Sequence, residues 1–182
     1  FSFFSTTSLS SMSFSLSIND VGKNDTHTVS WDMGDGNTNS SPTFTHTYVD
    51  NGEYTINVNV EDDDGGKDSW IQKIQIFNVA PTLEFSMPDS LFEGQTELFN
   101  VIAQDKGIND KLTYLWNFGD GSTDSTKEAN HSFPDNGEFK VFITVKDNDG
   151  GLTTSYKIIK IINVAPTLEA TVPKKQYEGT KI

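Results

Sequence analysis

The sequence predicts an all-β fold made of two-sheet sandwiches arranged in tandem. Three observations support this prediction: the chain repeats itself with one constant period, apolar residues inside each copy alternate with polar ones, and turns rich in glycine, asparagine and aspartate separate the alternating stretches. Alternation with period two is typical of a strand with one buried face. No stretch shows the spacing of an amphipathic helix, so each copy is expected to form several short strands around its own core.

The repeat is clearest at landmarks that share one offset. The spacing that separates Trp31 from Trp116 also relates Gly52 to Gly137, Gly65 to Gly150, and Pro81 to Pro166. Because one period fits without a gap, we expect two copies of one domain and the beginning of a third. The predicted boundaries are residues 1–79 for a first module with an atypical N-terminal edge, 80–164 for a second module, and 165–182 for the first strand of a third.

Four alternating stretches recur in both copies. In the first copy they cover residues 14–18, 29–33, 44–48 and 54–60, and in the second copy they recur at the same offset. The second stretch carries Trp31, and a central tryptophan among short strands is typical of an immunoglobulin-like sandwich. The last stretch is the strongest strand prediction, because four apolar residues alternate without interruption after an Asp-Asn-Gly turn.

Composition excludes several classes of function. The chain carries 13 basic residues, all lysine, and 26 acidic ones, for a formal net charge of -13. This charge disfavours nucleic acid as a partner and suits cations. The absence of cysteine excludes disulfides, zinc–thiolate sites and thiol nucleophiles. No apolar run approaches the roughly 18–20 residues of a membrane span, so no membrane insertion is expected.

A series of motifs occurs in both copies: Trp-(Asp/Asn)-x-Gly-Asp-Gly, then His-x-(Tyr/Phe), then Gly-x-(Tyr/Phe) with alternating Val/Ile, then Asp-x-x-Gly. This series resembles the PKD (polycystic kidney disease) domain family over about residues 14–164. Met33 stands where that family usually has phenylalanine, and Phe133 and Phe139 stand where it often has tyrosine. The resemblance implies a non-catalytic immunoglobulin-like module found in multidomain surface proteins and secreted hydrolases, where it spaces, adheres or presents.

The residues themselves also argue against an enzyme. The Gly-Asp-Gly turns at 34–36 and 119–121 lack the lysine and the following helix of a phosphate loop. Glycine permits positive φ there, and the aspartate is expected to accept hydrogen bonds from nearby backbone amides. His46 and His131 lie on a predicted strand among apolar residues, without a second catalytic partner. They are expected to be structural, and no nucleophilic serine motif is present.

Acidic residues recur after two of the predicted strands in both copies. Asp20 and Asp25 of the first copy correspond to Asp105 and Asp110 of the second, and an Asp-x-Asp-Gly sequence follows the strand at 54–60 and its counterpart. In an immunoglobulin-like sandwich these two loops lie at the same end as the domain's N-terminus. Four carboxylates per copy are therefore expected to converge near the linker.

Such a cluster suits calcium, which takes six to eight oxygen ligands at about 2.3–2.6 Å. The candidate metal ligands of the second copy are Asn78 from the linker, Asp105, Asp110, Asp147 and Asp149. Those of the first copy are Asp20, Asp25, Asp62 and Asp64. The pattern is not an EF-hand, because no glutamate stands at the twelfth loop position. An Asp-Gly turn with solvated acidic loops is the alternative interpretation, so calcium remains a candidate cofactor.

Two further features are the joints between the modules, which bear on the shape of the chain, and one aromatic residue that does not repeat. Pro81 and Pro166 restrict the chain directly after each module, so the joints should be stiff and the array an extended rod. Trp70 has Ser155 as its counterpart. We expect Trp70 to pack against the sandwich or the neighbouring module, with a sugar-stacking site as the alternative.

These features together predict a non-catalytic spacer or adhesion module of an extracellular or cell-surface protein. Its expected partners are a protein or carbohydrate surface ligand and the neighbouring modules of the same chain. A substrate-targeting accessory domain of a secreted protease or polysaccharide hydrolase is the alternative.

Overall fold

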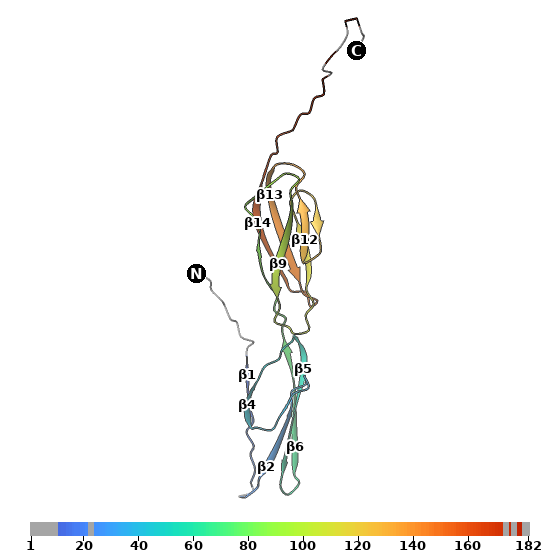
Figure 1. Cartoon of the computed structure of the whole chain (residues 1–182). Coiled ribbons are helices and arrows are strands. Elements are labelled where there is room, and N and C mark those ends of the chain that lie inside the picture. Colours follow the sequence, from blue (N-terminus) through green and yellow to red (C-terminus); the bar gives the residue numbers. More distant parts are fainter. Residues whose placement is uncertain (1–10, 22–23, 173–174, 176–177, 180–182) are drawn as a thin grey trace.

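The computed structural model describes residues 11–21, 24–172, 175 and 178–179 of the 182-residue chain. Figure 1 shows two β-sandwiches that lie end to end, with the first module at one end and the C-terminal segment leaving the far end of the second. The described residues contain strands and turns but no helix, so none of them forms a helix long and apolar enough to span a membrane. The all-β prediction is confirmed.

The first module contains six described strands. They are β1 (Met12–Ser15), β2 (His27–Asp32), β3 (Thr38–Asn39), β4 (Thr43–His46), β5 (Gly52–Asp62) and β6 (Lys67–Ile76). One sheet pairs β1 with β4, and the other has the order β3-β2-β5-β6, all antiparallel. The strand predicted at residues 14–18 is shorter than expected: β1 ends at Ser15, and the Ile18 side chain is 37% exposed.

The second module contains eight strands. They are β7 (Thr82–Ser86), β8 (Ser90–Phe92), β9 (Thr96–Gln104), β10 (Thr113–Asn117), β11 (Thr123–Asp124), β12 (Glu128–Ser132), β13 (Gly137–Lys146) and β14 (Leu152–Ile162). The sheets have the orders β12-β9-β7 and β11-β10-β13-β14-β8. Only β8 runs parallel to its neighbour, with Ser90 opposite Lys160. In the segment predicted to begin a third module, the described residues form no strand.

The registers of the two modules match at the predicted offset. Trp31 lies opposite Val58 between β2 and β5, and Trp116 lies opposite Ile143 between β10 and β13. Both tryptophans are buried, and each indole Nε1 donates to a backbone carbonyl, that of Ser41 (3.1 Å) or Thr126 (3.0 Å). A buried indole N–H without an acceptor would destabilise the core, so this bond explains why tryptophan is tolerated there.

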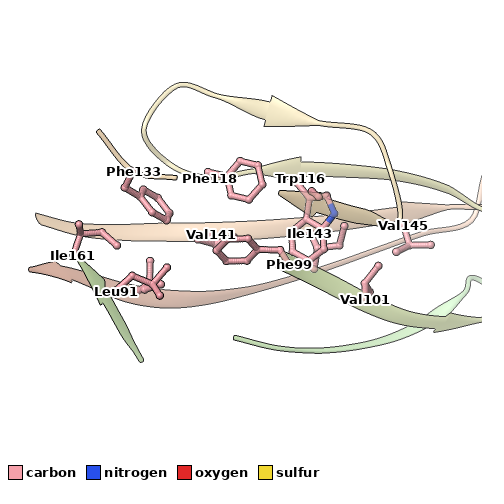
Figure 2. Packing of buried hydrophobic residues seen from close by; sticks show 12 residues of the cluster. Leu91, Phe99, Val101, Trp116, Phe118, Phe133, Val141, Ile143, Val145 and Ile161 are labelled. Carbon is pink, nitrogen blue, oxygen red and sulfur yellow. The ribbon is translucent and has the colours of Figure 1, made fainter. Parts of the chain in front are cut away.

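Inward-facing residues from both sheets form the core of each module. Figure 2 shows the core of the second module, where Phe99, Trp116 and Phe118 pack together with aliphatic residues of β13 and β14. The ring centroids of Phe99 and Phe118 are 5.2 Å apart in an edge-to-face arrangement, which aromatic pairs favour. In the first module Tyr48 occupies the place of Phe133, and its hydroxyl donates to the Met33 carbonyl at 2.9 Å.

Candidate functional site

The candidate site lies where the two modules meet. Two loops of the second module, residues 105–112 after β9 and 147–151 after β13, face the 49–51 turn that precedes β5 of the first module. The linker between β6 and β7, residues 77–81, passes beside them. This placement confirms that the two acidic loops share the linker end of the sandwich.

Asp147 organises the second of these loops. Its side chain is 2% exposed; Oδ1 accepts hydrogen bonds from the backbone amides of Asp149 (2.9 Å) and Gly151 (2.7 Å), and Oδ2 accepts one from Asn78 Nδ2 (2.8 Å). Burial by itself raises the pKa of Asp147, but these hydrogen bonds outweigh burial and hold the pKa below its ordinary value. Asp147 is therefore an ionised, buried carboxylate that ties the linker to the loop.

Gly151 is required by the same close packing. A Cβ atom at this position would overlap Asp147 Oδ2 and would lie 2.8 Å from the Ala80 Cα. Both approaches are closer than real contacts allow, so any side chain would push the linker away from the loop. The glycine directly after the Asp-x-x-Gly pattern thus serves the joint, in addition to the turn that the pattern itself forms.

Two sets of three carboxylates converge at the joint, and they share Asp110. One set is Asp105, Asp110 and Asp147, and the other is Asp50, Asp110 and Asp149. Within each set, one oxygen of every residue lies within 4.8 Å of the others. Oxygens on opposite sides of one calcium ion are separated by roughly twice the bond length of about 2.3–2.6 Å, so both sets have the dimensions of a calcium ligand shell.

Several oxygens of these sets have no hydrogen-bond donor. Asp105 Oδ2 and both carboxylate oxygens of Asp110 are buried and lack a partner. Burial, followed by the proximity of Asp149 and Asp105, raises the pKa of Asp110 to about 7. Buried oxygens without a donor are costly, and like charges at this spacing repel. The arrangement is therefore suited to taking up a proton or a cation.

The structure brings together most of the residues predicted for the second module and adds one. Asp105, Asp110 and Asp147 share a set, Asp149 lies in the other, and Asn78 joins through its amide nitrogen, which faces Asp147. Asp50 was not predicted to be near the site. Its position in the turn before β5 places it at the end of the first module from which the linker leaves, and this position in the fold is the signal that could have identified it.

The predicted ligands of the first module have a different arrangement. Asp62 Oδ1 accepts the backbone amides of Asp64 (3.0 Å) and Gly66 (2.7 Å), as its counterpart Asp147 does. Asp20 Oδ2, however, lies 3.0 Å from His27 Nε2. Among the described residues, no set of three ligands within 4.8 Å includes Asp20, Asp25, Asp62 or Asp64.

The repeated histidines pair with the Gly-Asp-Gly turns. His46 Nε2 lies 2.8 Å from Asp35 Oδ2, and His131 Nε2 lies 2.9 Å from Asp120 Oδ2. Asp35 Oδ1 also accepts the Asn37 backbone amide at 3.0 Å, so the predicted turn role of this aspartate is confirmed. Burial opposes ionisation of Asp35, but the Asn37 and His46 hydrogen bonds outweigh it and lower the pKa. These pairs connect a strand of one sheet to a turn of the other.

Comparisons with known proteins agree with the fold. The family model described as the PKD domain matches residues 5–76 and 78–161. Collagenase ColA of Clostridium perfringens is 36% identical over 67 residues, which are 36% of this chain and 6% of the collagenase. Collagenase ColA of Bacillus cereus is 44% identical over 39 residues, 21% of this chain and 4% of the collagenase. The chain thus corresponds to a small part of each of these relatives.

Two solved structures are similar to this chain at low sequence identity. The amphioxus IgVJ-C2 molecule is 14% identical with a TM-score of 0.50, covering 84% of this chain and 97% of that one, and it shows the same fold. The PKD1 domain of Vibrio anguillarum Epp is 24% identical with a TM-score of 0.40, covering 47% of this chain and 96% of that one.

Proposed function

Because this chain belongs to the PKD domain family, a family of non-catalytic modules, we propose that it is a stiff extracellular spacer and adhesion segment whose inter-module joint is held by calcium. In this function the modules set the distance and direction between other parts of a larger surface or secreted protein. Contacts with a protein or carbohydrate ligand would be spread over the repeated modules. No catalytic step is part of the proposal.

The observation that carries the proposal is a set of direct hydrogen bonds across the joint. The Ile108 backbone amide donates to the Val49 carbonyl at 3.1 Å, and Asn109 Nδ2 donates to Asp50 Oδ2 at 2.5 Å. On the linker, Asn78 is bonded to Asp147. A flexible tether would need none of these contacts, so the joint has the features expected of a spacer that holds one angle.

Calcium fits the donor set at this joint. The available ligands are carboxylate oxygens, which hard divalent cations prefer, and the sets contain no histidine and the chain no cysteine. The buried oxygens of Asp105 and Asp110 supply ligands that no protein donor satisfies. A bound ion would neutralise these charges and connect the loops of the second module to each other.

Small-angle scattering of the whole chain tests the proposal. In millimolar calcium, the affinity range of extracellular calcium modules, we expect one narrow distribution of interatomic distances with an extended maximum. Chelation of calcium should broaden the distribution, because the carboxylates then repel one another. An Asp105→Asn variant is the control and should respond weakly to calcium. Identical curves with calcium and with chelator would contradict the proposal.

A second candidate function is substrate targeting in a secreted protease, and the outer face of the second module favours it. Tyr156 and Leu115 are 53% and 50% exposed on this face, Phe142 lies beside Tyr156 with ring centroids 5.7 Å apart, and Lys140 Nζ is 3.7 Å from the centre of the Tyr156 ring. Because the buried β13 residues that flank Phe142 point into the core, Phe142 and its alternate neighbours must point outward. The flat aromatic face resembles a contact surface more than a solvated sheet.

Collagen is the occupant that we assign to this face, because relatives named collagenases carry matching segments. A collagen co-sedimentation assay with the whole chain tests it, and a Phe142→Ala/Tyr156→Ala double variant should lose binding. Ile71 occupies the position in the first module that corresponds to Tyr156, so an Ile71→Ala variant is the matched control. Equal co-sedimentation of all three proteins would exclude this face, and binding of a polysaccharide instead would reassign it.

A further inference from the structure

We propose that the joint holds two cations, and that the second of them lies between the modules, bound by Asp50 of the first module together with Asp110 and Asp149 of the second. This inference rests on the proposed calcium site and extends it in one respect: the preceding module supplies a ligand. The inner cation then belongs to Asp105, Asp110 and Asp147, and Asp110 bridges the two positions.

The position of Asp50 is fixed by contacts on both sides of the joint. Its Oδ1 accepts the Asn51 backbone amide at 3.0 Å, which shapes the turn before β5. Its Oδ2 accepts Asn109 Nδ2 from the second module. A Cβ atom at Gly107 would lie 3.0 Å from Asp50 Oδ1, so the glycine leaves room for this carboxylate. Asp50 is thus directed into the loop that carries Asp110.

The two oxygens of Asp110 provide the second observation. Both are buried and neither has a hydrogen-bond donor, and Asp110 is the residue common to both sets. A carboxylate with one oxygen directed to each of two cations satisfies both oxygens at once. A single ion bound through one oxygen would leave the other buried without a partner, which is unfavourable.

Asn51 connects the two modules beside this position. Its side-chain nitrogen donates to Asp50 Oδ1 and to Asp149 Oδ2, each at 3.2 Å. The amide therefore holds a carboxylate of the first module close to one of the second, as a shared cation would require.

Charge balance also favours two cations. Five carboxylates, from Asp50, Asp105, Asp110, Asp147 and Asp149, surround the joint. One divalent ion would leave most of this negative charge uncompensated within a partly buried volume, whereas two nearly neutralise it. Repulsion at this spacing and burial is strong, so the second cation is the one that makes contact between the modules favourable.

Calorimetric titration of the whole chain with calcium tests the inference. We expect two calcium ions per chain, and one for an Asp50→Asn variant. Asp135 is the matched control, because it is the counterpart of Asp50, makes the same turn hydrogen bond with the Asn136 amide (2.8 Å) and is exposed. An Asp135→Asn variant should keep both ions.

A distance measurement complements the titration. The chain has no cysteine, so spin labels at Ser69→Cys and Thr154→Cys report the separation of the modules without background. In calcium the distribution should be narrow, and Asp50→Asn but not Asp135→Asn should broaden it.

The outcomes distinguish the bridging cation from the calcium joint on which it rests. If Asp50→Asn binds calcium as the unaltered chain does while Asp105→Asn does not, the bridging ion is overturned and the calcium joint stands. If the unaltered chain binds one ion that Asp50→Asn retains, the bridging ion is likewise overturned. If the unaltered chain binds no calcium at all, both proposals fail.

Discussion

The two modules carry the same acidic loops, but the loops balance their charge in different ways. In the first module His27 Nε2 lies 3.0 Å from Asp20 Oδ2. In the second module the position of His27 is occupied by Leu112, and the corresponding Asp105 keeps a buried oxygen without a donor. The residue at this position therefore distinguishes a loop aspartate that meets a side chain of its own module from one that keeps a buried oxygen without a donor. A repeated sequence need not imply a repeated site.

The cores of the modules are expected to behave alike, in contrast with the loops. Trp116→Ala should lower the free energy of unfolding of the second module by about 3–5 kcal/mol, the usual cost of removing a buried tryptophan. Trp31→Ala should have a similar effect on the first module, since Trp31 is buried in the same register. Scanning calorimetry of the whole chain measures both. A single shared transition in both variants would show that the modules do not unfold independently.

Calcium should stabilise the two modules to different extents, whereas the tryptophan variants should destabilise them alike. At a hundredfold excess of calcium over its dissociation constant, an ion bound only by the native state stabilises it by about 2.7 kcal/mol. We expect calcium to stabilise the second module by about this amount. The first module should gain much less stability, because His27 accompanies Asp20 there. Calorimetry with calcium and with chelator is the measurement. Equal shifts in both transitions would refute the contrast.

The residue that differs between the two loops is His27 in the first module and Leu112 in the second. Exchanging it tests whether this position affects calcium binding. Leu112→His introduces the imidazole that meets Asp20 in the first module; if it meets Asp105 in the same way, it should weaken calcium binding by about tenfold, equivalent to about 1.4 kcal/mol. His27→Leu is the reciprocal variant and should leave calcium binding at the joint unchanged, because His27 lies opposite Asp62, at the other end of β5 from the 49–51 turn. Titration calorimetry reports both affinities. Unchanged binding in Leu112→His would mean that position 112 does not control the site.

The stability of the second module should also depend on pH, because Asp110 changes its protonation state. Its pKa is raised from 3.8 to about 7, so between about pH 4 and pH 7 the native state holds a proton that the unfolded chain has released. This proton therefore stabilises the native state most at pH values below that range, and the stabilisation is lost as pH rises through 7. Asp110→Asn should remove this slope, and saturating calcium should reverse it. Melting curves across this range are the check, with the transition of the first module as internal reference.

The smallest effect is expected at a surface ion pair that only the first module has. Lys73 Nζ lies 2.7 Å from Glu53 Oε1, and the counterpart of Lys73 is Ile158. Both side chains are mostly exposed, and such pairs contribute about 0–1 kcal/mol. Lys73→Ala should change the melting temperature of the first module by no more than a few degrees. A larger loss would show that this pair matters to the sheet.

The sequence predicted the fold because alternation and turn residues are local signals that both copies repeat. It also predicted that Asp105, Asp110 and Asp147 converge, since the ends of a sandwich follow from strand order. Asp50 could not be identified from its motif, because an Asp-Asn-Gly turn has a complete local explanation and its second role depends on contact with another module. The pairing of His131 with Asp120 likewise needs the two sheets in place, although the same spacing between aspartate and histidine recurs in both copies.

The joint residues affect how the end-to-end span of a longer array grows with the number of modules. Asn78 recurs as Asn163 and Asp50 as Asp135, so an array built from this repeat carries the joint residues once per module. With the joints held by calcium as proposed, the persistence length of such an array is set by the fraction of joints that bind the ion. An array with most joints occupied behaves as a rod whose span grows in proportion to the number of modules. With most joints empty it behaves as a coil, whose span grows roughly as the square root of that number.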